Sequence, residues 1–328
     1  MKVTKAKFKF HGGVHPPYNK ELARDKAVES LPMPKELVVS MSQHLGAPAK
    51  CIVAVGDHVE KGQLVGERNG FISVAVRAPA SGTVKALEKR QGAAGGMADA
   101  IITGGAEAAI HPLAIGGFAN SRALTHAETL EDACTPFDAR RSGFTMADGA
   151  GVLILEEYEH ALQRGATIYA EVAGYGNTCD AHHYTAPRPD GIPASKAIRM
   201  ALNEARYTSE DVLYINAHGT STPLNDKTET YAIKLALGEE DARKALISST
   251  KSMTGHMLGA AGAIEIIASA LAVKNGIVPP TINYKEPDPE CDLNYVPNKA
   301  VKVELTMAAS NSLGFGGHNA CVVLKKIN

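Results

Sequence analysis

The sequence has no tryptophan, few aromatic residues and almost no net charge. Aromatic residues make up 5% of the 328 residues, and 34 Lys and Arg against 35 Asp and Glu give a formal charge of −1. A chain without excess charge has no global attraction for nucleic acid or an anionic membrane surface, so neither is expected as a partner. Its 45% hydrophobic and 21% charged residues are ordinary for a soluble globular protein.

Paired cysteine motifs are also missing. No C-x-x-C pair occurs, which excludes a ferredoxin-type iron–sulfur run and a zinc knuckle. We therefore expect no cofactor. An odd number of widely spaced thiols is typical of reduced cysteines in the cytoplasm. The five cysteines are Cys51, Cys134, Cys179, Cys291 and Cys321.

No segment has the pattern of a signal peptide or an uninterrupted membrane span. The N-terminal MKVTKAKFKFHGG is basic but has no apolar core, so we do not expect a secretory signal. The most apolar stretch, residues 256–275, is interrupted by Glu265 and Lys274. This pattern predicts a buried helix and not a membrane span.

The character of the sequence changes near Gln91. Before it, short Val- and Ile-rich runs alternate with turn signals such as Gly56-Asp57, which predicts a small all-β module over residues 1–90. The Gly- and Ala-rich stretch 91–97 is expected to be a junction. His11, His15 and His44 lack the spacing of metal ligands, so they are expected in loops and turns. The strands expected before the junction are 37–40, 51–55, 71–76 and 82–87.

After the junction, strands alternate with helices over residues 98–328. This order predicts an α/β domain in which a mixed sheet is layered with helices. Pro193 is expected in the first turn of a helix. The last two strands are expected to be antiparallel around a Gly-rich turn. The strands expected here are 98–107, 149–157, 167–176, 212–219, 245–250 and the final pair in 303–326.

Three Gly-flanked segments follow apolar strands of this domain. They are NAHGTSTPLND (216–226), STKSMTGHMLGAAGAIE (249–265) and SNSLGFGGHNA (310–320). Sites in α/β proteins lie at the carboxyl ends of strands. Neutral His218 and His256 can donate N–H groups to a carbonyl oxygen and stabilise an enolate beside a thioester. Lys251 can orient charged groups nearby.

Each segment also has a purely structural interpretation. A single histidine after a strand is more often a core or capping residue than a ligand-binding one. His256 can simply open its helix, and Gly-Phe-Gly-Gly can simply be a hairpin turn. The three segments together, each at a strand end, favour the functional interpretation.

These segments carry a resemblance to a known family. Together with GGAEAAIHPLAIGGF (104–118), the long run 136–166 and PPTINY (279–284), they make residues 97–328 resemble the C-terminal part of 3-oxoacyl-[acyl carrier protein] synthase II. The resemblance implies a thiolase-like fold and decarboxylative condensation of an acyl thioester with malonyl carrier protein in fatty acid biosynthesis. It also implies an acyl carrier protein as partner.

The resemblance assigns roles to single residues. His218 and His256 match the catalytic histidine pair, Lys251 the active-site lysine, and Phe315 the gating phenylalanine whose N–H serves the oxyanion hole. Residues matching threonines that bind the pantetheine arm are Thr220 and Thr222. Residues matching a cation site of some relatives are Asn216, Glu265, Ser310 and Asn319, although a buried, hydrogen-bonded Glu265 explains that position equally well. At two positions this sequence differs from the residues that are commoner in the family: Leu313 stands in place of Phe and His318 in place of Thr. These differences leave the shape of the acyl pocket open.

The nucleophile of the family is missing. Its cysteine lies in a small-residue helix upstream of the GGAE turn, and the corresponding stretch here, around residues 75–90, contains no cysteine. The thiolate is the attacking group in such chemistry. Cys134 and Cys179 align with surface loops of the family and are not expected to replace it. Enzymatic activity is therefore left open.

The first 90 residues resemble a different family. KFHGGVHPPYNKELA (9–23), VGDHVEKGQLVGE (55–67) and VRAPASGTVKAL (76–87) are similar to the N-terminal region of the RnfC electron-transport subunit, which contains a barrel-sandwich hybrid. No Met-Lys-Met hairpin is present, so no biotin or lipoyl attachment is expected. The cluster-binding cysteines and the flavin region of that family are absent too.

Several hypotheses about the whole chain stay open. It is a condensing acyltransferase by descent, or a non-catalytic fusion or binding module that pairs with itself or a full-length synthase. It is alternatively an RnfC-related fragment, or an artefact in which two reading frames are joined near residues 91–97. Most of the family's first half is missing, so the long helix from His256 is expected to lack cover and the isolated chain to be poorly soluble.

Overall fold

The computed structural model describes residues 34–41, 48–70, 74–87 and 100–327. The described residues form two units, an N-terminal one within residues 34–87 and a C-terminal one of residues 100–327. The expected junction at 91–97 and the three histidines His11, His15 and His44 lie outside the described residues. Each unit is therefore described by itself.

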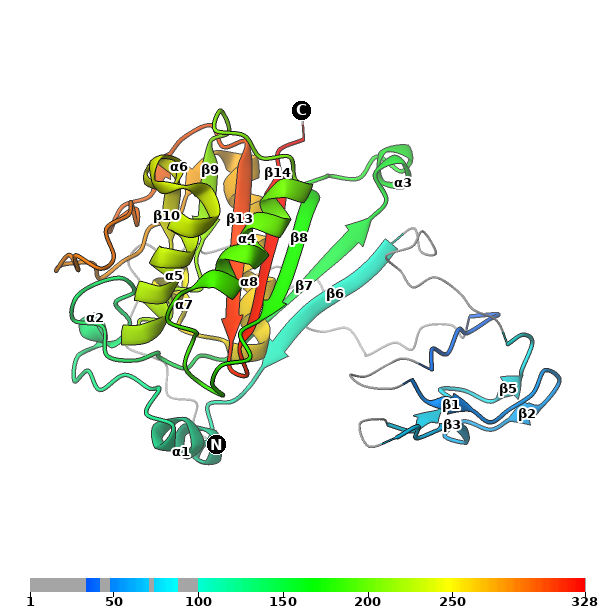
Figure 1. The fold of residues 1–328 in the computed structure, drawn as a ribbon. Helices are drawn as coiled ribbons and strands as arrows, with labels where there is room; N and C mark the ends of the chain where they lie inside the picture. Colours follow the sequence, from blue (N-terminus) through cyan, green and yellow to red (C-terminus); the bar gives the residue numbers. More distant parts are fainter. Residues whose placement is uncertain (1–33, 42–47, 71–73, 88–99, 328) are drawn as a thin grey trace, which may run out of the picture. The chain divides into compact units, whose positions relative to one another are not determined.

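A mixed five-stranded sheet forms the centre of the C-terminal unit, in the order β10-β9-β13-β14-β8 (Figure 1). β9 pairs in parallel with β10 and β13, whereas β14 is antiparallel to both of its neighbours. This confirms the mixed sheet that the sequence predicts. The strands are β8 (Glu171–Cys179), β9 (Leu213–Asn216), β10 (Leu246–Ser248), β13 (Met307–Gly314) and β14 (His318–Lys325).

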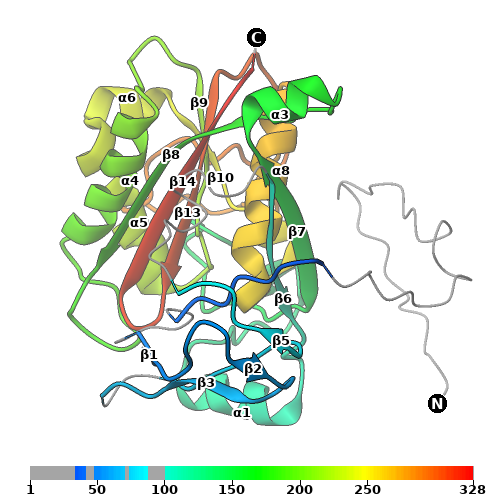
Figure 2. The same ribbon diagram turned by 90° about the vertical axis from the view of Figure 1, so that its right-hand side faces the viewer.

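Helices cover both faces of this sheet. α4 (Ile192–Glu204) and α5 (Pro223–Leu237) pack on one face, and α8 (Ala261–Asn275) packs on the other (Figures 1 and 2). Pro193 lies in the first turn of α4, as expected. Gly174 of β8 lets α4 approach closely, because a Cβ there would collide with a backbone carbonyl of the helix.

An antiparallel ribbon of two strands lies on the far side of α8. It consists of β6 (Ala100–Glu107) and β7 (Gly149–Glu156), and α8 runs between it and the five-stranded sheet (Figure 2). Gly105 and Gly151 face this helical layer. α8 and the 3₁₀ turn before it, Leu258–Asn275, are long and apolar enough to span a membrane by length and composition, and one third of this segment is buried. No residue of α8 before Lys274 is exposed.

The remaining elements of this unit are short. Two of them, α7 and the 3₁₀ helix η3, carry the segment 249–265 that the sequence singles out. These elements are α1 (Pro112–Asn120), α2 (Leu130–Ala133), α3 (Tyr158–Gln163), α6 (Glu239–Lys244), α7 (Lys251–Thr254), η3 (Leu258–Ala260), β11 (Ile277–Val278) and β12 (Val301–Lys302).

Two small sheets share one apolar core in the N-terminal unit. One has the order β1-β3-β4 and the other pairs β2 with β5, as expected for a small all-β module. The expected strand 37–40 is not formed, and Leu37 and Val38 are exposed. The strands are β1 (Lys50–Cys51), β2 (His58–Val59), β3 (Leu64–Glu67), β4 (Val76–Arg77) and β5 (Gly82–Thr83).

Candidate active site

Three segments of the C-terminal unit meet at one edge of the five-stranded sheet. β9, β10 and β13 run in parallel, so the segments that follow them leave the sheet at the same edge. His218 follows β9, Lys251 and His256 follow β10, and Phe315 lies in the turn between β13 and β14. The fold thus brings together the histidines that are far apart in the sequence.

The two histidines form a close pair. Their ring centroids are 5.3 Å apart and their planes are nearly perpendicular, at 87°. His218 is buried and His256 is half-buried. The ring of Phe144 lies edge-on to His256 at 5.2 Å, so an aromatic wall closes one side of the pair.

The surroundings hold both histidines neutral near pH 7. Burial, and then the positive charge of Lys251, lower the pKa of His256 to about 3. Burial, Lys251 and His256 also lower the pKa of His218 well below its usual value. The backbone N–H of Leu258 donates to Nδ1 of His256 over 3.2 Å, which leaves the proton of the neutral ring on Nε2. His256 therefore offers an N–H donor without carrying charge.

Two buried carboxylates fix the loop that carries His218. Glu229 accepts hydrogen bonds from the backbone N–H groups of His218 and Gly219, both at 2.8 Å. Asp226 accepts one from Ser221, whose φ of 67° is unusual for a side-chain-bearing residue. Burial raises the pKa of both carboxyls, and the hydrogen bonds oppose that shift.

These carboxylates do not appear among the residues singled out from the sequence. A signal was present, since Asp226 and Glu229 are three residues apart on α5 and so share one face of that helix. Both sit directly behind the loop 218–222. They hold this loop through its backbone N–H groups, and the side-chain amides of Asn225 and Asn311 also donate to them.

Lys251 forms a buried ion pair with Glu265 of α8. Burial raises the pKa of Glu265, and the charge of Lys251 opposes that shift. The amide of Asn216 donates to the backbone carbonyl of Glu265 and accepts from Thr250. One oxygen of the buried Glu265 carboxyl is thus paired with Lys251, whereas Oε2 has no hydrogen-bond partner among the described residues. The structural and the cation-binding interpretations of Glu265 both stay predictions.

The residues expected to form a cation site are not all brought together. Asn216 and Ser310 pair with each other on adjacent strands. Both lie on the sheet face covered by α8, the helix that carries Glu265. Asn319 pairs with Leu313, and alternation along the strands places both on the opposite face of the sheet. Its amide donates to Asp180 over 2.7 Å. Asn319 therefore lies apart from Asn216 and Ser310 in this structure, and the cation site stays a prediction. No group of three His, Cys, Asp or Glu that could hold a metal occurs among the described residues.

The remaining predicted residues lie on the loop after β9 and in the β13–β14 hairpin. The hydroxyls of Thr220 and Thr222 are 3.0 Å apart on the loop after β9. Phe315 is 45% exposed at the tip of the β13–β14 turn, and its ring centroid is 6.3 Å from that of Phe118. His318 is exposed at the start of β14.

No cysteine in the described residues is arranged as a nucleophile of this site. Residues 76–87, in the stretch expected to align with the nucleophile segment, form β4, β5 and loops of the N-terminal unit rather than a helix. Cys134 lies in the loop that follows α2. Its thiol is buried against the backbone carbonyl of Lys251 at 3.1 Å, and burial raises its pKa to about 12. Cys179 is exposed at the end of β8.

Comparison with known proteins agrees with this geometry. The model described as Beta-ketoacyl synthase, C-terminal domain matches residues 169–285, and the corresponding N-terminal domain matches residues 72–161. Over residues 72–161 and 169–285 this chain thus resembles the β-ketoacyl synthases. The RnfC Barrel sandwich hybrid domain matches residues 8–105, which identifies the N-terminal module as RnfC-like.

Individual relatives support the same assignment. The 3-oxoacyl-[acyl-carrier-protein] synthase 2 of Staphylococcus aureus strain COL is 55% identical over 231 residues, covering 70% of this chain and 56% of the relative. Its counterpart from a Synechocystis species is 51% identical over 264 residues, covering 78% of this chain and 63% of the relative. The chain thus spans little more than half the length of the S. aureus β-ketoacyl synthase.

Solved structures share the fold. A ketosynthase bound to a hexaketide, in complex with its type II polyketide acyl-carrier protein, is 46% identical with a TM-score of 0.69, covering 71% of this chain and 57% of that one. A β-ketoacyl synthase from Burkholderia phymatum STM815 is 36% identical with a TM-score of 0.66, covering 72% of this chain and 56% of that one. The thiolase-like fold expected for the C-terminal part is confirmed.

Proposed function

We propose that the C-terminal unit binds malonyl thioesters of an acyl carrier protein and decarboxylates them without condensing them with an acyl group. The observation that carries this proposal is the pair of His218 and His256, whose rings are 5.3 Å apart and whose pKa values are lowered. Two neutral imidazoles can both donate to one oxygen, whereas charged ones would repel each other.

The proposed reaction breaks the bond between the carboxylate carbon and the α-carbon of the malonyl group. The electron pair of that bond forms the enolate of the acetyl thioester, and carbon dioxide leaves. His256, through its Nε2–H, and His218 stabilise the developing negative charge on the thioester oxygen. A proton from water then completes the acetyl thioester.

The neighbouring residues have supporting roles in this proposal. Lys251 keeps the histidines neutral by its charge, and Glu265 keeps the buried lysine paired. Thr220 and Thr222 offer adjacent hydroxyls for the amides of a pantetheine arm, as the family resemblance implies. Phe315 stands exposed at the hairpin tip, where movement of its ring would open or close access. An acyl carrier protein accompanies the ketosynthase in one of the similar solved structures, which supports it as the partner.

Condensation is not part of the proposal, because it requires a thiolate to accept the acyl group. No cysteine occurs between Cys51 and Cys134 in the sequence. A thiol with a pKa of about 12, such as Cys134, is almost entirely protonated near pH 7 and is a poor nucleophile.

Conversion of malonyl carrier protein to acetyl carrier protein, followed by mass spectrometry, tests the proposal. Removing one oxyanion donor from an enzyme costs about 100- to 1,000-fold in rate, so His256→Ala, which leaves no side-chain donor, should lose at least about 100-fold. His182→Ala changes an exposed histidine that follows β8 and serves as the control. Equal rates for the wild type and His256→Ala would rule out the proposed role of the pair.

A second proposal concerns the origin of the chain. The RnfC and the N-terminal β-ketoacyl synthase matches overlap over residues 72–105, so two families meet in one short stretch. We infer a fusion with domains 1–90 and 98–328 around a junction at 91–97, in a cytoplasmic protein. Sequencing genomic DNA across this junction tests it, since separate frames in the DNA would show that the joined chain is an artefact.

A further inference from the structure

The β6–β7 ribbon presents one covered face and one open face. Successive residues alternate between its two faces, and Gly105 and Gly151 lie on the face that packs against η3 and α8. On the other face, Ile102, Val152 and Ile154 are exposed by 76%, 65% and 63%. The register pairs Ile102 with Ile154, so these side chains form a continuous apolar strip.

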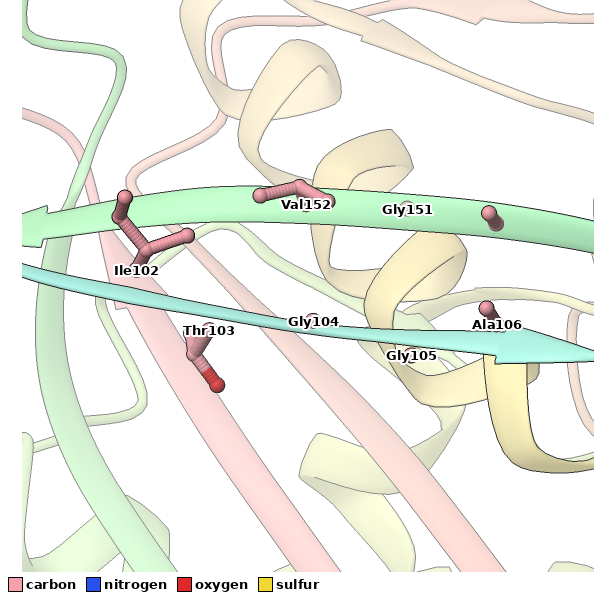
Figure 3. A pocket seen from close by; sticks show the side chains of 8 residues that line it. Ile102, Thr103, Gly104, Gly105, Ala106, Gly151 and Val152 are labelled. Carbon is pink, nitrogen blue, oxygen red and sulfur yellow. The ribbon is translucent and has the colours of Figure 1, made fainter. Parts of the chain in front are cut away.

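Small residues continue this strip and leave a hollow in it. Gly104, Ala106 and Ala150 are exposed beside Val152 and line a shallow depression with it (Figure 3). Large side chains around a row of small ones form a surface on which a helix can pack closely. Large exposed apolar patches on soluble proteins mark interaction sites.

The outer edges of the ribbon are also open. Among residues 100–327, no strand pairs with the outer edge of β6 or of β7. An unpaired edge presents a row of backbone N–H and C=O groups that can pair with a strand of another chain. A two-stranded ribbon by itself is only marginally stable in water.

The β13–β14 pair in the same unit is paired with another strand at both edges and covered by helices on both faces. It has eight residues in each strand, as the ribbon does, and α8 covers one of its faces. β9 and β8 pair with its two edges, and α4 covers its other face. The ribbon shares α8 with this pair but has no counterpart of β9, β8 or α4 in the described part of the chain (Figure 2).

We propose that the ribbon is a docking surface for the N-terminal part of a β-ketoacyl synthase supplied by a second polypeptide. This partner would add a strand to each edge and lay an apolar helix on the strip of Ile102, Val152 and Ile154. The chain spans only 56% of the S. aureus relative, so more than two fifths of that protein has no counterpart here. A second copy of this chain would bring another ribbon and the exposed apolar helix α1, so the dimer of the chain alone is measured as the competing outcome.

Binding in this proposal does not depend on the proposed decarboxylation. Recovery of condensing activity in the complex would depend on it, because the partner would have to bring a cysteine to the histidine pair. Binding and activity are therefore measured separately, and loss of decarboxylation alone leaves the docking proposal intact.

Co-expression tests the docking. The full chain, with an affinity tag, is produced together with the segment of the S. aureus synthase that precedes its matched region. Native mass spectrometry should then show a one-to-one complex. Ile154→Glu should lower the recovery of this complex at least tenfold, because docking would bury the new charge on the open face without a partner. Ile277 is 47% exposed and lies on β11, away from the ribbon, so Ile277→Glu is the matched control and should have no effect.

Hydrogen exchange provides a measurement that needs no variant. Amides on the outer edges of β6 and β7 should be protected in the complex and exchange freely in the chain alone. Absence of a complex with a folded chain would overturn the proposal. So would a dimer of the chain alone that Ile154→Glu dissociates, because the occupant would then be a second copy.

Discussion

His256 should make the stability of the C-terminal unit depend on pH in a defined direction. Its pKa is about 3 in the folded protein and about 6.5 in an unfolded chain. Between these values the unfolded state binds more protons, so stability falls as the pH drops below about 6.5. At pH 5.0, roughly 1.5 units below the unfolded value, the loss from this one group is about 2 kcal/mol.

Replacing His256 by Asn removes this contribution. The difference between the unfolding free energies at pH 7.5 and pH 5.0 should shrink by about 2 kcal/mol in His256→Asn. Urea unfolding followed by far-ultraviolet circular dichroism measures it, because the chain has no tryptophan to report by fluorescence. His182→Asn, which changes an exposed histidine, should retain the wild-type difference. If His256→Asn retains it too, the histidine is not held neutral by burial and Lys251.

Three further predictions concern the packing of the site. Lys251→Met should destabilise the C-terminal unit by about 3–5 kcal/mol in urea unfolding, because it leaves the buried Glu265 without its partner; an unchanged midpoint would contradict this. Iodoacetamide under native conditions should modify Cys179 and spare Cys134, as peptide mass spectrometry can determine; rapid labelling of Cys134 would reopen it as a nucleophile. Gly105→Ala should lower the melting temperature, since its Cβ would collide with the backbone of η3; an unaltered melting curve would contradict the close packing of the ribbon.

Much of the C-terminal fold could be predicted from the sequence. The runs at 100–107 and 149–156 are long enough to indicate strands, and Pro193 marks the start of a helix within one residue. The N-terminal strands were harder to place, because most of them are only two residues long. Their positions are set by pairing across the module and by the shared core, which local patterns do not encode.

In the candidate site, too, local patterns predict some features, whereas others are set by tertiary contacts. The motifs correctly indicate that His218, Lys251 and His256 meet, because each follows a strand that ends at one edge. The face on which Asn319 lies depends on the register of the β13–β14 hairpin, and local sequence patterns do not predict that register. The burial of Cys134 likewise depends on the backbone of Lys251, which is 117 residues away in the chain.

Product analysis tests the central claim most directly. The claim is that the chain retains the donors that stabilise an enolate but has no thiolate to carry an acyl group. Incubation of the purified chain with malonyl carrier protein and an acyl carrier protein thioester, followed by mass spectrometry of the carrier proteins, separates the two steps. The account predicts acetyl carrier protein and no 3-oxoacyl product. Formation of a 3-oxoacyl carrier protein, or no loss of carbon dioxide from malonyl carrier protein, would contradict it.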